Sequence, residues 1–271
     1  MNTEIDGSGT VRARCVLAPN ASIMTLDGTN TWLLAEPGSP TAIVVDPGPK
    51  EEGHLRRVRE TAEQAGQRVS RIVLTHRHQD HCAGARLLAE MTGADILAVD
   101  PQLRLGSEGL GPGAVVSGAG CELRVITTPG HTSDSVCLFI EADSAVLTGD
   151  TVLGRGTTVI ARDGSLGDYL ASLDTLRALV DSAQLRTLLP GHGPLLTDPA
   201  GVVDYYITHR AERLAQVTDA ISAGDRSVDD IVARVYADED RKLWPFARSS
   251  VRAQLIYLAE QGALPPGMTA P

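Results

Sequence analysis

Residues 76–81 read HRHQDH and come directly after the apolar run RIVLT at 71–75. They place three histidines and an aspartate within six positions of a chain that has only 7 histidines in 271 residues. Imidazole and carboxylate groups are the ligands that zinc and similar divalent metals take. The fold of this chain therefore has to bring the end of a short strand to an edge where other segments can supply further ligands.

Three more histidine or aspartate residues end apolar runs farther along the chain. VITTPGH ends at His131, AVLTGD ends at Asp150 and TLLPGH ends at His192. Strand ends that gather at one edge of a sheet are where α/β folds build their sites. The candidate metal ligands are therefore His76, His78, Asp80, His81, His131, Asp150 and His192.

Seven ligands suffice for two ions if one carboxylate bridges them, and each ion then keeps an open position for water, as a catalytic site requires. A structural zinc site would instead be closed by four ligands that usually include thiolates. The four cysteines form no CxxC pair and are expected to be reduced, buried apolar residues. His54 and His209 lie outside the pattern and are expected at the surface or in the packing.

Apolar β-branched runs alternate with helical patterns up to about residue 200. Strands are predicted at 41–48, 95–100 and 136–142, among others. Residues 165–182 are predicted to form an amphipathic helix whose apolar face carries Leu166, Leu170, Leu173, Leu176 and Val180. This alternation predicts an α/β fold in which helices cover packed sheets.

The pattern becomes almost entirely helical after about Tyr206. Ser227 is predicted to cap a helix, with Asp230 at the capping-box position, and a last helix is predicted from about Ser250 to Gly262. We therefore predict two domains, at residues 1–207 and 208–271.

The net charge of −10 argues against broad, non-specific adhesion to nucleic acid, although it leaves room for a local basic patch. The sequence has no apolar run of the roughly 20 residues that a membrane span needs, and its polar N-terminus lacks the regions of a signal peptide. These features predict a cytoplasmic protein without membrane contact. They do not decide between a monomer and a homodimer.

At the candidate ligands the chain resembles the metallo-β-lactamase superfamily. The superfamily pattern H-x-H-x-D-H is complete at residues 76–81, the later His, Asp and His match His131, Asp150 and His192, and VVDPG matches the early aspartate motif at Asp46. The resemblance implies an αββα sandwich and an Asp46 that orients ligands. An aspartate at position 150 resembles the glyoxalase-II and nuclease branches, and a histidine at position 78 argues against the di-iron redox branch.

Further motifs resemble the beta-lactamase-like-protein-two family. They include NASIMTLDGTNTWLL, TPGHTSDS, GDTVLGRGTTVI, PGHGP and HRAER. This resemblance implies a small, helical, winged-helix-like domain at the C-terminus. It also implies endoribonuclease activity on single-stranded RNA.

The resemblance implies a hydrolase with two zinc ions and a hydroxide held between them. His76, His78 and His131 are expected to hold one ion, and Asp80, His81 and His192 the other, with Asp150 as the bridge. Asp80 is the expected catalytic residue, as acceptor of a proton from the attacking water. The alternative for Asp80 is a role as ligand alone.

The ligands do not select the substrate, so two enzymatic readings stay open. The first is an RNA phosphodiesterase, for which Trp244 and Tyr257 could stack on bases beside a basic track. The alternative for these residues is an ordinary solvated helix surface with a buried Trp244. The track would consist of Arg210, Arg213, Arg234, Arg241, Lys242, Arg248 and Arg252. The second is a hydrolase of a small thioester, lactone or β-lactam. A non-enzymatic winged-helix regulator is the third hypothesis, and the complete ligand set argues against it.

Overall fold

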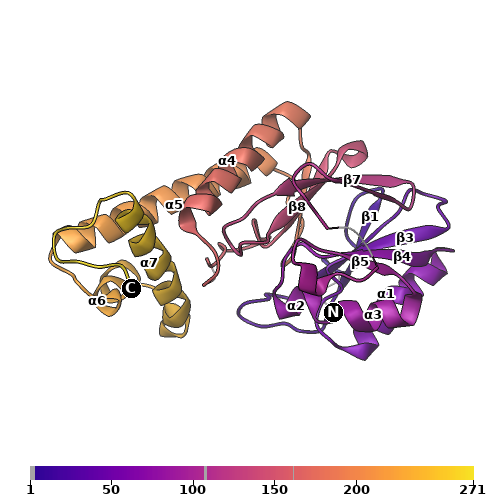
Figure 1. The fold of residues 1–271 in the computed structure, drawn as a ribbon, viewed down its shortest axis with the longest axis horizontal. Helices are drawn as coiled ribbons and strands as arrows, with labels where there is room; N and C mark the ends of the chain where they lie inside the picture. Colours follow the sequence, from indigo (N-terminus) through magenta and orange to yellow (C-terminus); the bar gives the residue numbers. More distant parts are fainter. Residues whose placement is uncertain (1–3, 107–108, 161) are drawn as a thin grey trace.

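The computed structural model describes residues 4–106, 109–160 and 162–271. Over these residues the strands form two five-stranded sheets (Figure 1). The first sheet has the order β1 (Ala13–Leu17), β2 (Asn30–Leu34), β3 (Thr41–Val45), β4 (Arg68–Val73) and β5 (Asp95–Leu97). The second has the order β10 (Thr187–Pro190), β9 (Ala145–Gly149), β8 (Val136–Ile140), β7 (Cys121–Thr127) and β6 (Val115–Gly118).

The hydrophobic core lies between the two sheets. Ile43 and Val45 of β3 share this core with Leu123 and Leu147 of the second sheet, whereas Val44 belongs to the cluster on the outer face. Successive side chains of a strand point to opposite faces, so strands covered on both sides read as nearly continuous apolar runs. This explains why β3 could be predicted from its sequence.

Helices cover both outer faces and complete the expected αββα sandwich (Figure 1). On the first sheet lie α1 (Glu52–Gln64) and α3 (Ala85–Thr92), and on the second lie α4 (Leu166–Ala183) and the first part of α5 (Pro199–Ser222). The short helix α2 (Gln79–Cys82) and the 3₁₀ turns η1 (Pro101–Leu103) and η2 (Glu141–Asp143) lie in the connections. The parallel pairs β3–β4, β4–β5 and β9–β10 are each joined through a helical crossover.

Helix α4 differs in one detail from its prediction. Its side chains at 166, 173, 176 and 180 are buried as expected, but Tyr169 is buried where Leu170 was expected, and Leu170 is only partly buried. The buried stripe follows steps of three and four residues, and 169 fits that stripe better than 170. The Ser165 hydroxyl caps this helix by accepting a hydrogen bond from the Asp168 N–H.

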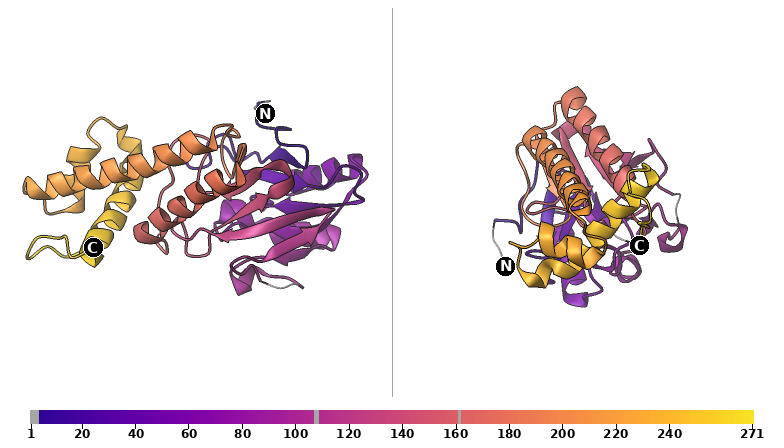
Figure 2. Two further views of the ribbon diagram at one scale, coloured as in Figure 1. Left: turned by 90° about the horizontal axis from the view of Figure 1, so that it is seen from above. Right: turned by 90° about the vertical axis from the view of Figure 1, so that its left-hand side faces the viewer.

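The C-terminal part has its own small core (Figure 2). The end of α5 packs there with α6 (Val228–Val235) and α7 (Trp244–Glu260), and the 3₁₀ turn η3 (Arg241–Leu243) directly precedes α7. The predicted cap of α6 is present: the Ser227 hydroxyl accepts from the Asp230 N–H at 3.1 Å and donates to the Asp230 carboxylate at 2.6 Å.

Two features of this part differ from the sequence analysis. Helix α7 begins at Trp244 instead of near Ser250, with Pro245 in its first turn, where proline is favoured. The predicted division at residue 207 falls inside α5, which runs unbroken from the sandwich into the C-terminal part (Figure 2). The domain boundary therefore stays a prediction. No helix among the described residues is both long and apolar enough to cross a bilayer.

Candidate metal centre

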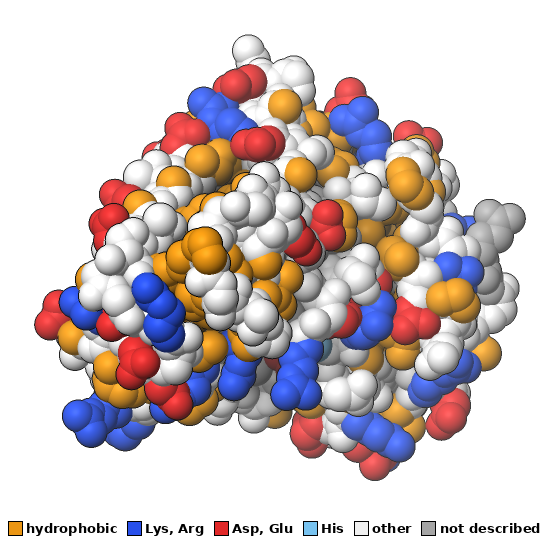
Figure 3. Space-filling model, turned by 60° about the vertical axis from the view of Figure 1, so that its left-hand side comes forward, with side chains coloured by type: hydrophobic (Ala, Val, Ile, Leu, Met, Phe, Trp, Pro, Cys, Tyr) orange, Lys and Arg blue, Asp and Glu red, His pale blue; other side chains and the backbone are white. Residues whose placement is uncertain are grey.

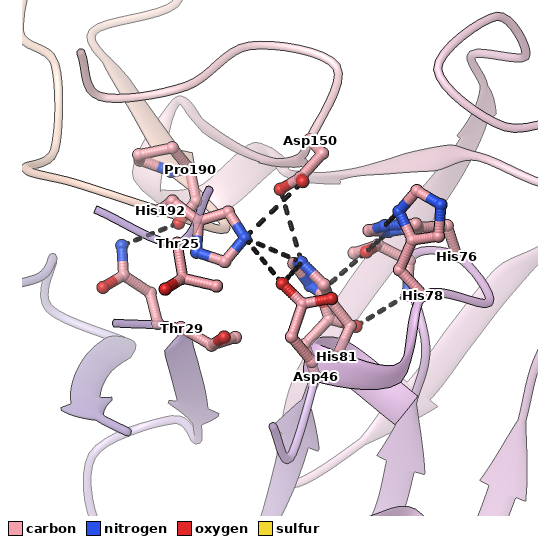
Figure 4. A network of polar contacts seen from close by, with 12 residues as sticks. Thr25, Thr29, Asp46, His76, His78, His81, Asp150, Pro190 and His192 are labelled. Carbon is pink, nitrogen blue, oxygen red and sulfur yellow. Dashed lines mark hydrogen bonds and ion pairs between the residues drawn. The ribbon is translucent and has the colours of Figure 1, made fainter. Parts of the chain in front are cut away.

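The structure brings the seven candidate ligands together at one edge of the sandwich. Four of them follow β4, in the loop at 74–78 and in α2, and the others follow β7, β9 and β10. Figure 4 shows Asp150 between His192 on one side and His76 and His78 on the other. Segments that are far apart in the chain thus meet at a single site, although the role of each residue as a ligand stays a prediction.

One group of donor atoms comes from three histidines. Nδ1 of His78 lies 3.1 Å from Nε2 of His76 and 3.0 Å from Nε2 of His131. A carboxylate oxygen of Asp150 lies 3.6 Å from the same His131 nitrogen. These four residues offer ligand atoms close enough to hold one ion.

A second group lies directly beside the first. Nε2 of His192 lies 3.1 Å from Nε2 of His81 and 3.2 Å from Oδ2 of Asp80. Asp150 also reaches this group, with Oδ1 3.4 Å from Nε2 of His81 and Oδ2 3.5 Å from Nε2 of His192. Asp150 therefore lies beside both groups, in the position expected of a bridging carboxylate.

Hydrogen bonds on the side of each histidine ring that faces away from the site show that its Nδ1 carries a proton. Nδ1 of His131 lies 2.6 Å from the Val159 carbonyl, and Nδ1 of His192 lies 3.1 Å from the Gly28 carbonyl. A carbonyl oxygen can only accept, so in both rings we assign an N–H to Nδ1, which leaves Nε2 as the ring atom available to a metal. Nδ1 of His81 likewise faces the Asp46 carboxylate. The Nε2 atoms of these rings all face the site.

With these assignments, the nitrogen and oxygen atoms that face the site can bind cations. The Nε2 atoms of His81 and His192 face each other at 3.1 Å. Oδ1 of Asp150 is buried and receives no hydrogen bond from the described residues. Two nitrogens bound to one tetrahedral zinc ion at about 2.0–2.1 Å would lie about 3.3 Å apart, close to the spacings found here. Nitrogen and oxygen donors in this arrangement fit divalent zinc.

The pKa values of the buried histidines shift in opposite directions in the two groups. Burial, together with the nearby charge of His81, keeps the pKa of His76 well below its usual value, and burial also lowers the pKa of His131. Burial alone would do the same to His192, but the carboxylates of Asp150 and Asp80 raise its pKa to about 9. Without a metal, protons on the carboxylate side balance the negative charge that a cation would otherwise balance.

Asp46 lies behind the His81 ring and fixes its orientation. Its carboxylate accepts hydrogen bonds from the N–H and the hydroxyl of Thr75, at 2.8 and 2.6 Å, and lies 2.9 Å from Nδ1 of His81. It is 2% exposed and adopts a positive φ of 51°, which aspartate tolerates better than most residues. The predicted orienting role of Asp46 agrees with these contacts.

Gly191 shows why the PGH motif needs a glycine. A Cβ at this position would lie 2.7 Å from Oδ1 of Asp150 and 2.7 Å from Cε1 of His81. The backbone of residue 191 therefore passes too close to two candidate ligands for any side chain to fit.

An apolar cleft of about 330 Å³ opens from His131 and Asp150 toward the C-terminal part. Ile23 and Met24, from the loop after β1, form part of its wall and are 54% and 43% exposed. Leu243 and Phe246, from the C-terminal part, line it as well. Figure 3 shows one side of the molecule in space-filling form, with a group of hydrophobic side chains left of the centre of the view.

The sequence analysis missed these apolar walls, although the pair Ile23–Met24 within the otherwise polar NASIMTLDG segment was an available signal. It placed His209 at the surface or in the packing, and His209 in fact lines the cleft. The loop at 155–159 lines the cleft as well, whereas Thr132 and Ser135 are buried.

The predicted basic track does not form a continuous cationic surface. Arg234 pairs with Asp225 and Arg248 with Asp229, each at 2.5 Å. The assignment of Arg210 to this surface is wrong, because Arg210 is 5% exposed and faces the sandwich. Of the two aromatic residues expected to stack on bases, Trp244 packs against the C-terminal core and Tyr257 is partly buried.

The matches to known protein families fall in two separate parts of the chain. A profile of the Metallo-beta-lactamase superfamily matches residues 24–192, and one of the beta-lactamase associated winged helix domain matches residues 227–263. A "Beta-lactamase-like protein 2 homolog" of Drosophila melanogaster is 30% identical, with 92% of this chain and 88% of that protein covered. An "Atrochrysone carboxyl ACP thioesterase" of Pseudocercospora fijiensis is 28% identical, with 90% and 74% covered.

Among solved structures, a beta-lactamase domain protein from Burkholderia ambifaria has the same fold, with a TM-score of 0.77 and 23% identity over 92% of this chain and 86% of that one. The sandwich and the C-terminal helices therefore have counterparts that span almost the whole chain. The chain belongs to the metallo-beta-lactamase superfamily of hydrolases, and it carries the winged helix domain associated with that fold.

Proposed function

We propose that this hydrolase works with two zinc ions. His76, His78 and His131 hold one ion, Asp80, His81 and His192 hold the other, and Asp150 contacts both. The inward-facing ring nitrogens and the position of Asp150 beside both groups support this assignment. When bound, such ions supply Lewis acidity and lower the pKa of water from about 15.7 to about 7.

Asp80 is the catalytic residue in this proposal. Its side chain is 31% exposed, against 12% for Asp150, so Asp80 is the carboxylate that meets solvent at the site. Burial opposes its charge, but the hydrogen bond to His192 and the charge of His81 outweigh burial and lower its pKa. An ionised Asp80 can accept a hydrogen bond from the attacking water and orient it toward the substrate.

The substrate that the geometry supports best is an acyl thioester or ester. The observation that carries this choice is the apolar cleft that opens directly from His131 and Asp150. Its volume of about 330 Å³ lies at the lower end of the range of about 300–1,000 Å³ for small-molecule sites. One relative that covers most of the chain is named a thioesterase, which is consistent with this chemistry.

Single-stranded RNA is the second candidate substrate. In its favour, Arg155 and Arg213 line the same cleft. Against it, Arg155 pairs with Asp27 and Arg213 lies 3.4 Å from Glu239, so neither offers an unpaired charge to a phosphate. RNA binding depends on cations that track the backbone, and the pairing of these side chains weakens such a track.

A substrate panel separates the candidates. Zinc-loaded protein would be assayed with an acyl-pantetheine thioester, with nitrocefin as the β-lactam, and with a labelled single-stranded oligoribonucleotide. We expect thioester turnover, and we expect Asp80→Ala to reduce it by about 10²–10⁴-fold. Asp219→Ala, at an exposed position of α5 away from the cleft, is the matched control and should retain full activity.

Two results would contradict this assignment. Cleavage of the oligoribonucleotide at a rate that falls steeply with salt, without thioester turnover, would replace the acyl substrate by RNA. Thioester turnover that survives exhaustive chelation would remove the metal ions from the proposal altogether.

A further inference from the structure

Arg210, on α5, is buried in an unusual way. It is 5% exposed, and no carboxylate of the described residues lies within ion-pair distance of its guanidinium. Arginine is rarely buried without a charged partner, because removing its charge from water costs free energy. A buried arginine of this kind needs other contacts that offset this cost. The contacts of Arg210 connect it to the metal centre.

The guanidinium of Arg210 contacts a loop and a ring. One terminal N–H donates to the carbonyl of Thr158, and the guanidinium carbon lies 4.9 Å from the centroid of the Tyr169 ring. The Tyr169 hydroxyl donates to the Thr151 carbonyl at 2.7 Å. Arg210 and Tyr169, from two neighbouring helices, thus hold the two ends of the segment 151–158.

Tyr206 holds the middle of the same segment. It lies one helical turn before Arg210 on α5, and its hydroxyl accepts from the Leu153 N–H at 2.9 Å and donates to the Gly156 carbonyl at 3.1 Å. Helices α4 and α5 lie side by side behind the segment (Figure 2). Their side chains therefore fix a loop that begins directly after Asp150.

The far end of this loop contacts two candidate ligands. The Thr158 hydroxyl donates to the backbone carbonyl of Asp150 at 2.7 Å. The next residue, Val159, supplies the carbonyl that lies 2.6 Å from Nδ1 of His131 and so fixes which nitrogen of that ring faces the metal. A displacement of residue 158 would therefore move the partner of His131.

We infer that Arg210 is a positioning residue for the metal centre. By holding the Thr158 carbonyl, it keeps the Val159 carbonyl where it orients His131. The connection makes α5, which also carries the C-terminal part, a support for one half of the site. This inference rests on the metal binding proposed above and is independent of the substrate.

The inference predicts an unequal effect on the two ions. Groups that orient a metal-bound histidine typically change metal affinity by about 10–100-fold. Arg210→Met keeps the length of the side chain and removes its donors, so it should weaken the ion held by His131 by that factor. The ion held by His81 and His192 should bind as before, because Asp46 and Gly28 orient those rings.

The test is a titration in which the protein competes with a chromophoric chelator for zinc. It has to give a separate affinity for each of the two ions. Arg210→Lys keeps the charge but lacks the planar fork, and should recover only part of the lost affinity. Arg177→Ala is the matched control: Arg177 joins α4 to α5 through Asp204 and makes no contact with the loop. It should leave both affinities unchanged.

Arg210→Lys also keeps the inference falsifiable if Arg210→Met does not fold. We expect it too to weaken one ion selectively. Equal weakening of both ions, or wild-type affinities in a folded Arg210→Met or Arg210→Lys protein, would overturn the inference. A wild-type protein that binds no zinc would instead overturn the proposed function.

Discussion

Nδ1 of His81 lies 2.9 Å from Oδ2 of Asp46, and neither side chain is more than 2% exposed. The same carboxylate also accepts two hydrogen bonds from Thr75. A residue that binds no metal in our proposal thus fixes the direction in which a candidate ligand points. Such a contact predicts that metal affinity depends on Asp46.

Asp46→Asn should weaken zinc binding by about 10–100-fold. The amide tolerates the positive φ of this position, but its NH₂ group cannot accept from the three donors that face Asp46. We also expect the free energy of unfolding of the metal-free protein to fall by about 1–3 kcal/mol. Chelator competition and urea denaturation measure the two effects, with Asp219→Asn as the exposed control. Unchanged zinc affinity would show that Asp46 does not orient His81.

His54 should make the protein sensitive to acid. It is 2% exposed, and burial, helped by the charge of Arg57, lowers its pKa to about 4. Because the folded-state pKa lies below the unfolded value of about 6.5, its contribution to stability is complete above pH 6.5 and is lost as the pH falls toward 4. The loss amounts to about 3 kcal/mol.

His54→Gln should remove this dependence while keeping a polar partner for the Thr31 hydroxyl. Urea denaturation of both metal-free proteins between pH 4.5 and 7.5 would be compared, using the difference between them so that the other histidines cancel. If the two stability curves stay parallel across this range, His54 is not the group that titrates.

Zinc should stabilise the folded protein and chelation should reverse the effect. A ligand present at 100 times its dissociation constant contributes about 2.7 kcal/mol to the free energy of unfolding. His192→Ala should reduce the thermal shift caused by zinc, because it removes a donor of one group. His54→Gln, which changes a histidine outside the site, should retain the full shift. Melting curves that do not respond to zinc in the wild-type protein would argue against the metal centre.

Gly191→Ala should damage the site through steric contact alone. The added methyl group would lie 2.7 Å from Oδ1 of Asp150, so Asp150 or the backbone has to move. We expect loss of zinc binding together with a lower melting temperature. Gly111→Ala is the control, because a Cβ there meets nothing within 4 Å. A Gly191→Ala protein with normal zinc stoichiometry would contradict the close approach.

Phe246→Ala should affect long acyl substrates more than short ones. Phe246 lines the cleft, and burying an aromatic side chain against substrate contributes about 1.5–3 kcal/mol. We expect kcat/KM for a long-chain thioester to fall by about 10–100-fold and that for the acetyl thioester to stay unchanged. Ile256→Ala, on the same helix at a 43% exposed position outside the cleft, is the control. A loss independent of chain length would remove Phe246 from the substrate site.

The sandwich and the ligand-rich edge could be predicted because their signals are local. Each of His131 and His192 follows an apolar run closed by Pro-Gly, and β3 is apolar on both faces. The strands β1, β2 and β6 were not predicted. β6 is short, lies at an edge and leaves Val115 51% exposed, so it lacks the continuous apolar pattern of a covered strand.

The contacts of Arg210 could not be predicted, because they depend on long-range packing. In the sequence it is one of several arginines in a helical region, a pattern typical of a solvated surface. Its burial arises only when α5 packs beside α4 and both meet the loop after β9. The partner carbonyl, at Thr158, lies 52 residues away along the chain.

Helix α5 is a single element of 24 residues that begins against the second sheet and ends in the C-terminal core. Its first half carries the side chains that hold the loop beside Asp150, so these cannot be removed with the C-terminal part without disturbing the metal site. Recombination that exchanges one accessory module for another has to join the chains beyond this helix, in the turn after Ser222. The segment that can be exchanged is then the one that contains α6 and α7, whereas α5 stays with the hydrolase and joins the two parts.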